Sequence, residues 1–110
     1  MRMNNPRDYS RVFRQAQHVG GGGLTILSVE NEVGHPRLGL AIAKKHLKLA
    51  TQRNRLKRLI RESFRHHQAS FANIDIVVLS RHDVKKRDVS KIRAALAKHW
   101  ITVEAQWEKS

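Results

Sequence analysis

The spacing of apolar residues predicts three helices. Asn5 and Pro6 are typical of a helix start, so a first helix is expected over residues 6–17. A central helix is expected over residues 50–67, and Asp88 can cap a last helix. The apolar positions at helical spacing are Tyr9, Val12, Phe13 and Ala16 in the first helix, and Val89, Ile92, Leu96 and Trp100 in the last.

Three segments between these helices read as strands. Residues 24–29 are β-branched and apolar, and a polar turn over 31–36 separates them from a strand over 37–43. In that strand large residues (Leu38, Leu40, Ile42) alternate with small ones (Gly39, Ala41, Ala43). One face of the strand therefore carries large apolar side chains, and the other, the small face, carries only glycine and alanine. Residues 74–79 form an almost continuous apolar run, typical of a strand buried on both faces.

These elements follow the order α, β, β, α, β, α, which predicts an α/β protein of the α+β sandwich kind with a strand, helix, strand centre. The glycine run over residues 20–23 is expected to be a flexible joint after the first helix. At 110 residues the chain is long enough for one core, so a single domain over 1–110 is expected.

Charge is the strongest compositional signal. The chain has 22 Lys and Arg against 9 Asp and Glu, a formal net charge of +13. A polyanion is therefore the expected partner. Because the apolar segments are patterned, the charge belongs to a folded body and not to a disordered basic tail. The sequence has no cysteine and no apolar run long enough to span a membrane, which favours a cytoplasmic location.

The central helix concentrates this charge on one side. At about 100° per residue, Leu56, Leu59, Ile60 and Phe64 share one arc, which is the expected core face. Glu62 can pair with Arg58 but offsets little of the repulsion among the other cations, and phosphates would neutralise them. The opposite side carries a basic ridge, formed by Asn54, Lys57, Arg58, Arg61 and Arg65 with Arg53 and Arg55 at its two flanks.

Several other interpretations of the basic face remain open at this point. A charged helix face is often only a solvated surface, but mixed signs would then be expected. A ribosomal or other general RNA-binding protein, and a basic amphipathic peptide on anionic membranes, would both carry such a face. A DNA-binding helix pair fits poorly, because strands bracket the basic helix.

Catalytic and metal-binding patterns are weak. The seven histidines lack paired ligand spacing, and residues 20–23 lack the lysine and hydroxyl residue of a nucleotide-binding loop. The acidic residues are dispersed, so no carboxylate pair for catalytic Mg²⁺ is evident. We therefore expect no catalytic residue, no metal ligand and no small-molecule substrate in the protein alone.

Residues 53–65, RNRLKRLIRESFR, closely resemble the RNR motif helix of the bacterial ribonuclease P protein family. Residues 37–45, RLGLAIAKK, resemble the strand and Lys-Lys connection before that helix, and residues 75–78, DIVV, resemble the strand after it. Residues 8–13, DYSRVF, are similar to the family's aromatic leading helix, so the resemblance covers nearly the whole chain.

The resemblance implies a small mixed sheet whose strand, helix, strand crossover is left-handed, against the usual preference. It also implies a non-catalytic protein subunit of an endoribonuclease, in which the catalytic RNA binds the Mg²⁺ that performs hydrolysis. The basic ridge of the helix over residues 50–67 would face that RNA, with Lys44 and Lys45 beside it. Precursor tRNA is the implied substrate.

In this family a cleft between the leading helix and one sheet face holds the 5′ leader of precursor tRNA. Tyr9 and Phe13 match its aromatic positions, and Arg37 is assigned to the cleft with them. The small face of the strand over 37–43 would leave room for a strand of RNA in this cleft, or only for a closely packed helix. Unpaired bases stack on aromatic rings whatever their sequence; an ordinary apolar helix stripe is the structural alternative. Two departures are a short basic segment, residues 1–5, and Thr25, Ile26 and Leu27 where relatives carry a first-strand aromatic.

Overall fold

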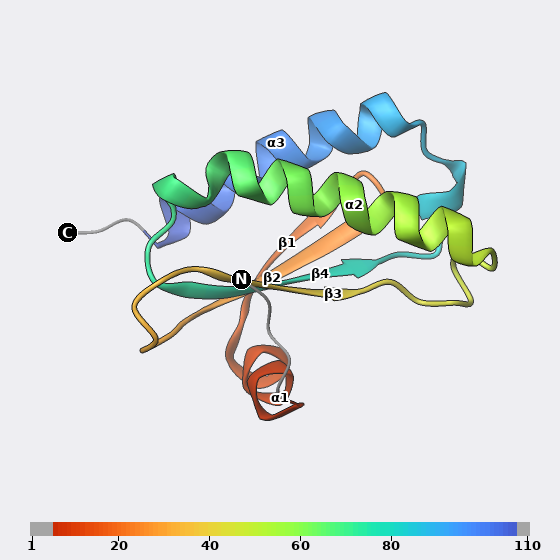
Figure 1. Ribbon diagram of the computed structural model, residues 1–110. Helices are drawn as coiled ribbons and strands as arrows, with labels where there is room; N and C mark the ends of the chain where they lie inside the picture. The colour runs from red at the N-terminus through yellow and green to blue at the C-terminus, as the bar shows by residue number, and fades with distance from the viewer. Residues whose placement is uncertain (1–5, 108–110) are drawn as a thin grey trace.

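Alternating side chains give the central sheet two different faces, each covered by helices. In the computed structural model, which describes residues 6–107, α2 and α3 lie on one face and α1 lies on the other (Figure 1). The elements are α1 (Pro6–Gln15), β1 (Gln17–Gly21), β2 (Leu24–Glu30), β3 (Arg37–Ala41), α2 (Ala50–His67), β4 (Ile74–Ser80) and α3 (Val89–Gln106). Two single 3₁₀ turns, η1 (Gln68–Ser70) and η2 (Val84–Lys86), flank β4.

The sheet is mixed, with the strand order β1-β2-β4-β3. β1 pairs with β2 and β2 with β4 in the antiparallel sense, whereas β3 and β4 are parallel and joined through α2. This confirms the predicted α/β sandwich with its strand, helix, strand centre. The left hand of the crossover stays a prediction of the resemblance.

The larger core lies between the sheet and the helices α2 and α3. As predicted, α2 buries Leu56, Leu59, Ile60 and Phe64. Phe64 and Phe71 both lie close to Trp100 of α3, with ring centroids 6.1 and 5.7 Å from it. Because the Trp100 indole donates a 2.7 Å hydrogen bond to the Ser63 hydroxyl, its one polar atom is satisfied inside this core.

A smaller core lies under α1 on the other face. Val12 is fully buried there against Leu27, Val29 and Val77. Tyr9 covers Gly39: a Cβ built on Gly39 would lie 2.7–2.9 Å from the Tyr9 ring and hydroxyl. At Gly39 the small face of β3 therefore admits a closely packed helix residue, the second of the two explanations considered for that face.

The glycine run is the main error in the sequence prediction. Gly20 and Gly21 end strand β1, and Gly22 and Gly23 turn the chain into β2, so the run forms a hairpin and not a flexible joint. The first helix accordingly ends at Gln15, and the sheet has four strands where three were predicted. Gly22 and Gly23 have φ of 67° and 86°, a backbone conformation that favours glycine.

The other boundaries agree closely with prediction. α2 covers 50–67 as expected, and β4 is buried on both faces from Ile74 to Val78. β3 ends at Ala41, two residues early, because the chain turns and the Ala43 N–H donates a 2.8 Å hydrogen bond to Ser80 Oγ. Asp88 is the N-cap of α3, but its side chain makes no capping hydrogen bond.

Candidate nucleic-acid interface

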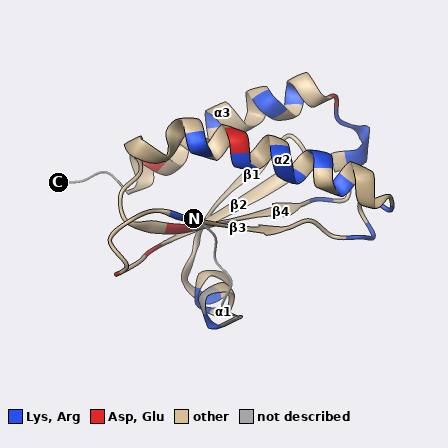
Figure 2. Cartoon of the chain, in the orientation of Figure 1, with Lys and Arg blue, Asp and Glu red and all other residues tan. Residues whose placement is uncertain are grey.

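The basic ridge of residues 53–65, from here on called the α2 ridge, lies on the side of α2 opposite its buried residues Leu56, Leu59, Ile60 and Phe64. Figure 2 shows basic residues on successive turns of α2, interrupted by one acidic residue, Glu62. Asn54, Arg55, Arg58 and Arg65 are exposed, whereas Arg53, Lys57 and Arg61 are partly buried. The helix thus presents several cations in one direction, as the helical wheel predicts.

The protein's own carboxylates leave this ridge unneutralised. Among the side chains that the structure describes, ion pairs join Arg11 and Arg37 to Asp75, and Arg87 to Asp83. None of them involves a cation of the α2 ridge, and the pair between Arg58 and Glu62 that the sequence allows is not formed. The ridge therefore keeps the one-signed charge that phosphates could neutralise.

Arg53, at one flank of the ridge, also stabilises the fold. The Arg53 guanidinium donates hydrogen bonds to the carbonyl oxygens of Leu47 and Lys48, at 2.7 and 2.9 Å. These bonds hold the segment that enters α2. Sequence reasoning missed this role, because backbone carbonyls outside the helix leave no residue pattern.

A groove of about 650 Å³ runs beside the ridge, between α2 and the edge strand β3. Buried Leu38 and Phe64 supply its apolar part. Its polar lining comes from Asn54, Arg58, Arg61, Glu62, Arg65 and Gln68. The ridge is thus one wall of a hollow and not a flat surface.

Lys44 and Lys45 lie in the exposed turn between β3 and α2. Around this turn His46 Nδ1 lies 2.8 Å from Ser80 Oγ, and the Leu47 N–H donates to the Ala43 carbonyl. Because β3 and α2 are consecutive, the two lysines flank the N-terminal end of the α2 ridge, where the resemblance places them.

Further cations lie next to the ridge that the sequence prediction did not include. Lys85, Lys86 and Arg87 are exposed around η2, and a hollow of about 160 Å³ brings Lys85 and Arg87 together with Arg55. A hydrogen bond from Arg87 keeps the pKa of the Asp83 carboxyl below its usual value. Three consecutive basic residues were a visible signal, but only the fold shows that they adjoin α2.

The residues predicted for the leader cleft lie on the opposite side of the sheet, which we call the α1 face. Phe13 is 49% exposed, whereas Tyr9 is half-buried over Gly39. Thr25 and Leu27 of β2 lie on this face and Ile26 on the other. Residues 1–5, where the short basic segment was noted, lie outside the described residues.

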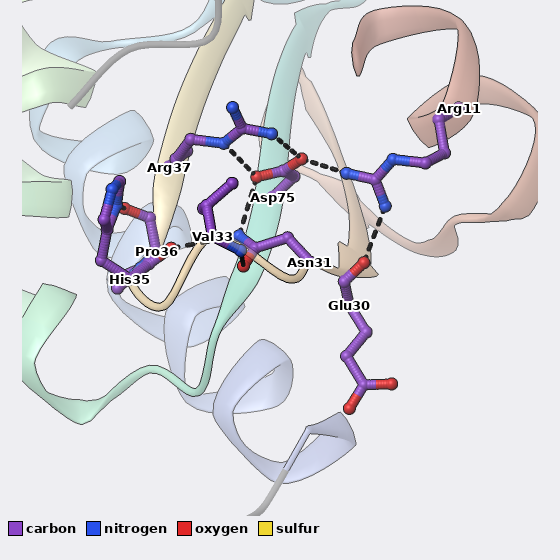
Figure 3. Close-up of polar contacts among 8 residues, drawn as sticks. All are labelled: Arg11, Glu30, Asn31, Val33, His35, Pro36, Arg37 and Asp75. Carbon is purple, nitrogen blue, oxygen red and sulfur yellow. Dashed lines mark hydrogen bonds and ion pairs between the residues drawn. The ribbon is translucent and has the colours of Figure 1, made fainter.

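Arg37 is also on the α1 face, but its guanidinium binds a buried carboxylate. Its Nε and Nη2 donate to the two oxygens of Asp75, each at 2.7 Å. Arg11 of α1 and Asn31 bind the same carboxylate (Figure 3). Sequence reasoning missed Asp75; its only signal was a single acid in an apolar run predicted to be buried.

The described residues contain neither a cluster of metal ligands nor a membrane-spanning helix. Among residues 6–107, no group of three or more His, Asp or Glu side chains could hold a metal ion. No helix in that part of the chain is long and apolar enough to cross a membrane. The features present are basic surfaces on a mixed α/β framework.

These features define a class: a small basic α/β protein that presents an unneutralised cationic helix to a polyanion. The family model for Ribonuclease P matches residues 1–104. The chain belongs to the ribonuclease P protein family. It is therefore a protein component of ribonuclease P, an endoribonuclease complex that processes tRNA, and its partner is an RNA.

Individual relatives agree with this assignment. The chain is 47% identical over 100 residues to the ribonuclease P protein component of Pectobacterium atrosepticum, covering 91% of this chain and 84% of the relative. It is 45% identical, with the same coverage, to that of Proteus mirabilis. The Staphylococcus aureus RNase P protein structure superimposes with a TM-score of 0.83 at 29% identity, covering 93% of both chains. For a Thermotoga maritima RNase P protein the TM-score is 0.78 at 28% identity, covering 90% of this chain and 96% of that one.

Proposed function

We propose that the protein binds the catalytic RNA of ribonuclease P through the α2 ridge and the 5′ leader of precursor tRNA on the α1 face. It thereby assists the endonucleolytic cut that produces the mature 5′ end of tRNA. The observation that carries the proposal is the absence, within residues 6–107, of any ion pair to the cations of the ridge. Such a helix is stabilised when RNA phosphates take up its charge.

The leader would use different chemistry from the catalytic RNA. Phe13 is exposed enough to stack on an unpaired base, at about 1–3 kcal/mol per base. Tyr9 would contribute its free edge, since its ring already covers Gly39. Stacking does not depend on base identity, so the α1 face suits leaders of different sequence.

Phosphodiester hydrolysis is assigned to the RNA. The Mg²⁺ ions that activate water would be bound mainly by the catalytic RNA, because the described part of the chain offers no cluster of ligands for them. The protein's contribution is to hold RNA and substrate together, which raises the affinity for both substrate and Mg²⁺.

A salt titration of binding to the catalytic RNA tests the ridge. Arg58→Ala with Arg61→Ala should weaken binding and flatten its dependence on salt, by about 0.7–0.9 in log–log slope per lost phosphate contact. Arg14→Ala, which removes an exposed cation from the opposite side of the sheet, should leave the slope nearly unchanged. An unaltered slope in the ridge variant would contradict the proposal.

Reconstitution tests the role in cleavage. Added to the catalytic RNA, the protein should lower the Mg²⁺ requirement and favour precursor tRNA that carries a leader. If it binds the RNA but changes neither property, a general RNA-binding role without assistance to cleavage is the correct description.

A further inference from the structure

Asp75 is a carboxylate buried in the protein interior. It lies on β4 with no exposed surface, on the side of the strand that faces α1. An unpaired carboxylate in such a place would be strongly unfavourable, so its oxygens need donors. Oδ1 accepts from Arg37 Nε at 2.7 Å and Asn31 Nδ2 at 2.9 Å; Oδ2 accepts from Arg37 Nη2 at 2.7 Å and from Arg11 Nη2.

These four hydrogen bonds join segments that are distant in the chain. Arg37 begins β3, Asn31 follows β2, and Arg11 is in the middle of α1 (Figure 3). Arg11 also donates from Nη1 to the carbonyl oxygen of Glu30, at 2.7 Å, so it fastens α1 to the sheet at two points. Asn31 extends the network into the next loop, through a 3.1 Å bond to the His35 carbonyl.

The helix α1 depends on such fastening. It has only 10 residues, and helices of this length are marginal without tertiary contacts. Among its described side chains, buried Val12 and half-buried Tyr9 provide the apolar contact with the sheet, and Ala16 packs beside them just after the helix. Arg11 is two residues from both Tyr9 and Phe13, so the angle at which Arg11 holds the helix also determines where the two rings lie.

We propose that Asp75 is a positioning residue for leader binding: through Arg11 and Arg37 it fixes α1 on the sheet and so places Tyr9 and Phe13. This inference rests on the proposed function of the α1 face. It also gives Arg37 a second role, because the guanidinium predicted to contact the leader binds Asp75.

Removing the carboxylate has two opposing consequences, which makes the proposal testable. Two guanidinium charges would share the site without their counter-charge, and greater positive charge by itself attracts RNA more strongly. Loss of the fastening frees α1 and displaces the rings, which weakens stacking. A positioning role predicts weaker binding of the leader, and a role in moderating charge predicts tighter binding.

The experiment uses the holoenzyme reconstituted with catalytic RNA. The KM for precursor tRNA with a long leader is compared with the KM for the same tRNA with a one-nucleotide leader. For Asp75→Asn we expect the leader-dependent gain to fall about tenfold, the equivalent of about one stacked base. We expect kcat at saturating substrate and affinity for the catalytic RNA to change little, because the α2 ridge lies on the other face of the sheet.

A milder variant covers the case in which Asp75→Asn does not fold. Arg11→Gln keeps the bidentate pair between Arg37 and Asp75 and removes both links that Arg11 makes from α1, to Asp75 and to the Glu30 carbonyl. Its matched control is Arg14→Gln, the same charge change at an exposed position of the same helix. We expect Arg11→Gln to lose most of the leader-dependent gain and Arg14→Gln to keep it.

The outcomes separate the two proposals. If the unaltered protein gives no leader-dependent gain, leader binding on the α1 face is wrong. If it gives the gain and Arg11→Gln retains it, or Asp75→Asn increases it, the positioning role of Asp75 is overturned.

Discussion

The helix α1 packs so closely on the sheet at Gly39 that only a residue without a side chain fits there unstrained. A Cβ there would lie 2.7 Å from the Tyr9 hydroxyl oxygen, so Gly39→Ala must push the ring aside. We expect the free energy of unfolding, measured in urea, to fall by about 1 kcal/mol, because the ring is the far end of a movable side chain. In a Tyr9→Ala background the same change should be neutral or stabilising, by about 0.4–1 kcal/mol, since alanine restricts the unfolded chain. Equal effects in both backgrounds would show that the contact is unimportant.

At the scale of residues, the sequence predicts which side chains are buried better than it predicts which partners they find. The core face of α2 is predicted correctly, because the spacing of apolar residues that defines it lies within a single helix. Asp75 is different: its partners Arg11 and Arg37 are 64 and 38 positions away, and they reach it through the packing of α1 on the sheet and through the register of β3 with β4. A single acid in a buried apolar strand requires cations, but the sequence offers 22 of them.

Repulsion among the cations of the α2 ridge is expected to lower the stability of the protein when no RNA is bound. Arg61 has like-charged neighbours three or four positions away at Lys57, Arg58 and Arg65, and each such pair costs about 0.2–0.5 kcal/mol. Arg61→Gln should therefore raise the free energy of unfolding by about 0.5 kcal/mol at low salt, while it weakens RNA binding. The gain should disappear near 1 M salt, where exposed charges are screened.

Arg93→Gln is the matched control for Arg61→Gln. Arg93 is exposed on α3 and has no charged residue three or four positions away, so its removal should leave stability almost unchanged. If Arg61→Gln lowers stability at low salt, the packing of its aliphatic stem outweighs the repulsion, and the ridge is not under electrostatic stress.

At the scale of elements, α2 is the element that the sequence predicts most accurately, and β1 is the one that it misses. Eighteen residues of regular period predict α2 to the residue. β1 was missed because two of its five residues are glycine, which is depleted in strands, and because its support comes from outside. It pairs along its length with β2, and His99 of α3 lies 2.9 Å from the Gly21 carbonyl oxygen. Such non-local support cannot be deduced from a glycine-rich segment.

At the scale of the whole molecule, the sheet separates the two proposed RNA-binding surfaces. The α2 ridge lies over the larger core, and the α1 face over the smaller one. The residues of these two surfaces are assigned largely through the family resemblance, whereas their separation follows from α1 packing on the opposite face of the sheet (Figure 1). In this proposal two RNAs bind without sharing a side chain of the protein.

This division predicts additive effects of variants on the two faces. Arg58→Ala should weaken binding of the catalytic RNA, and Phe13→Ala should reduce the leader-dependent gain by about 1–3 kcal/mol per lost stacking contact. Because the sheet lies between them and they share no partner, the double variant should equal the sum within about 0.5 kcal/mol. Each single variant should also leave the other readout unchanged. A larger coupling energy would mean that binding on one face reshapes the other, and the sheet would then transmit the state of the catalytic RNA to the leader instead of separating the two.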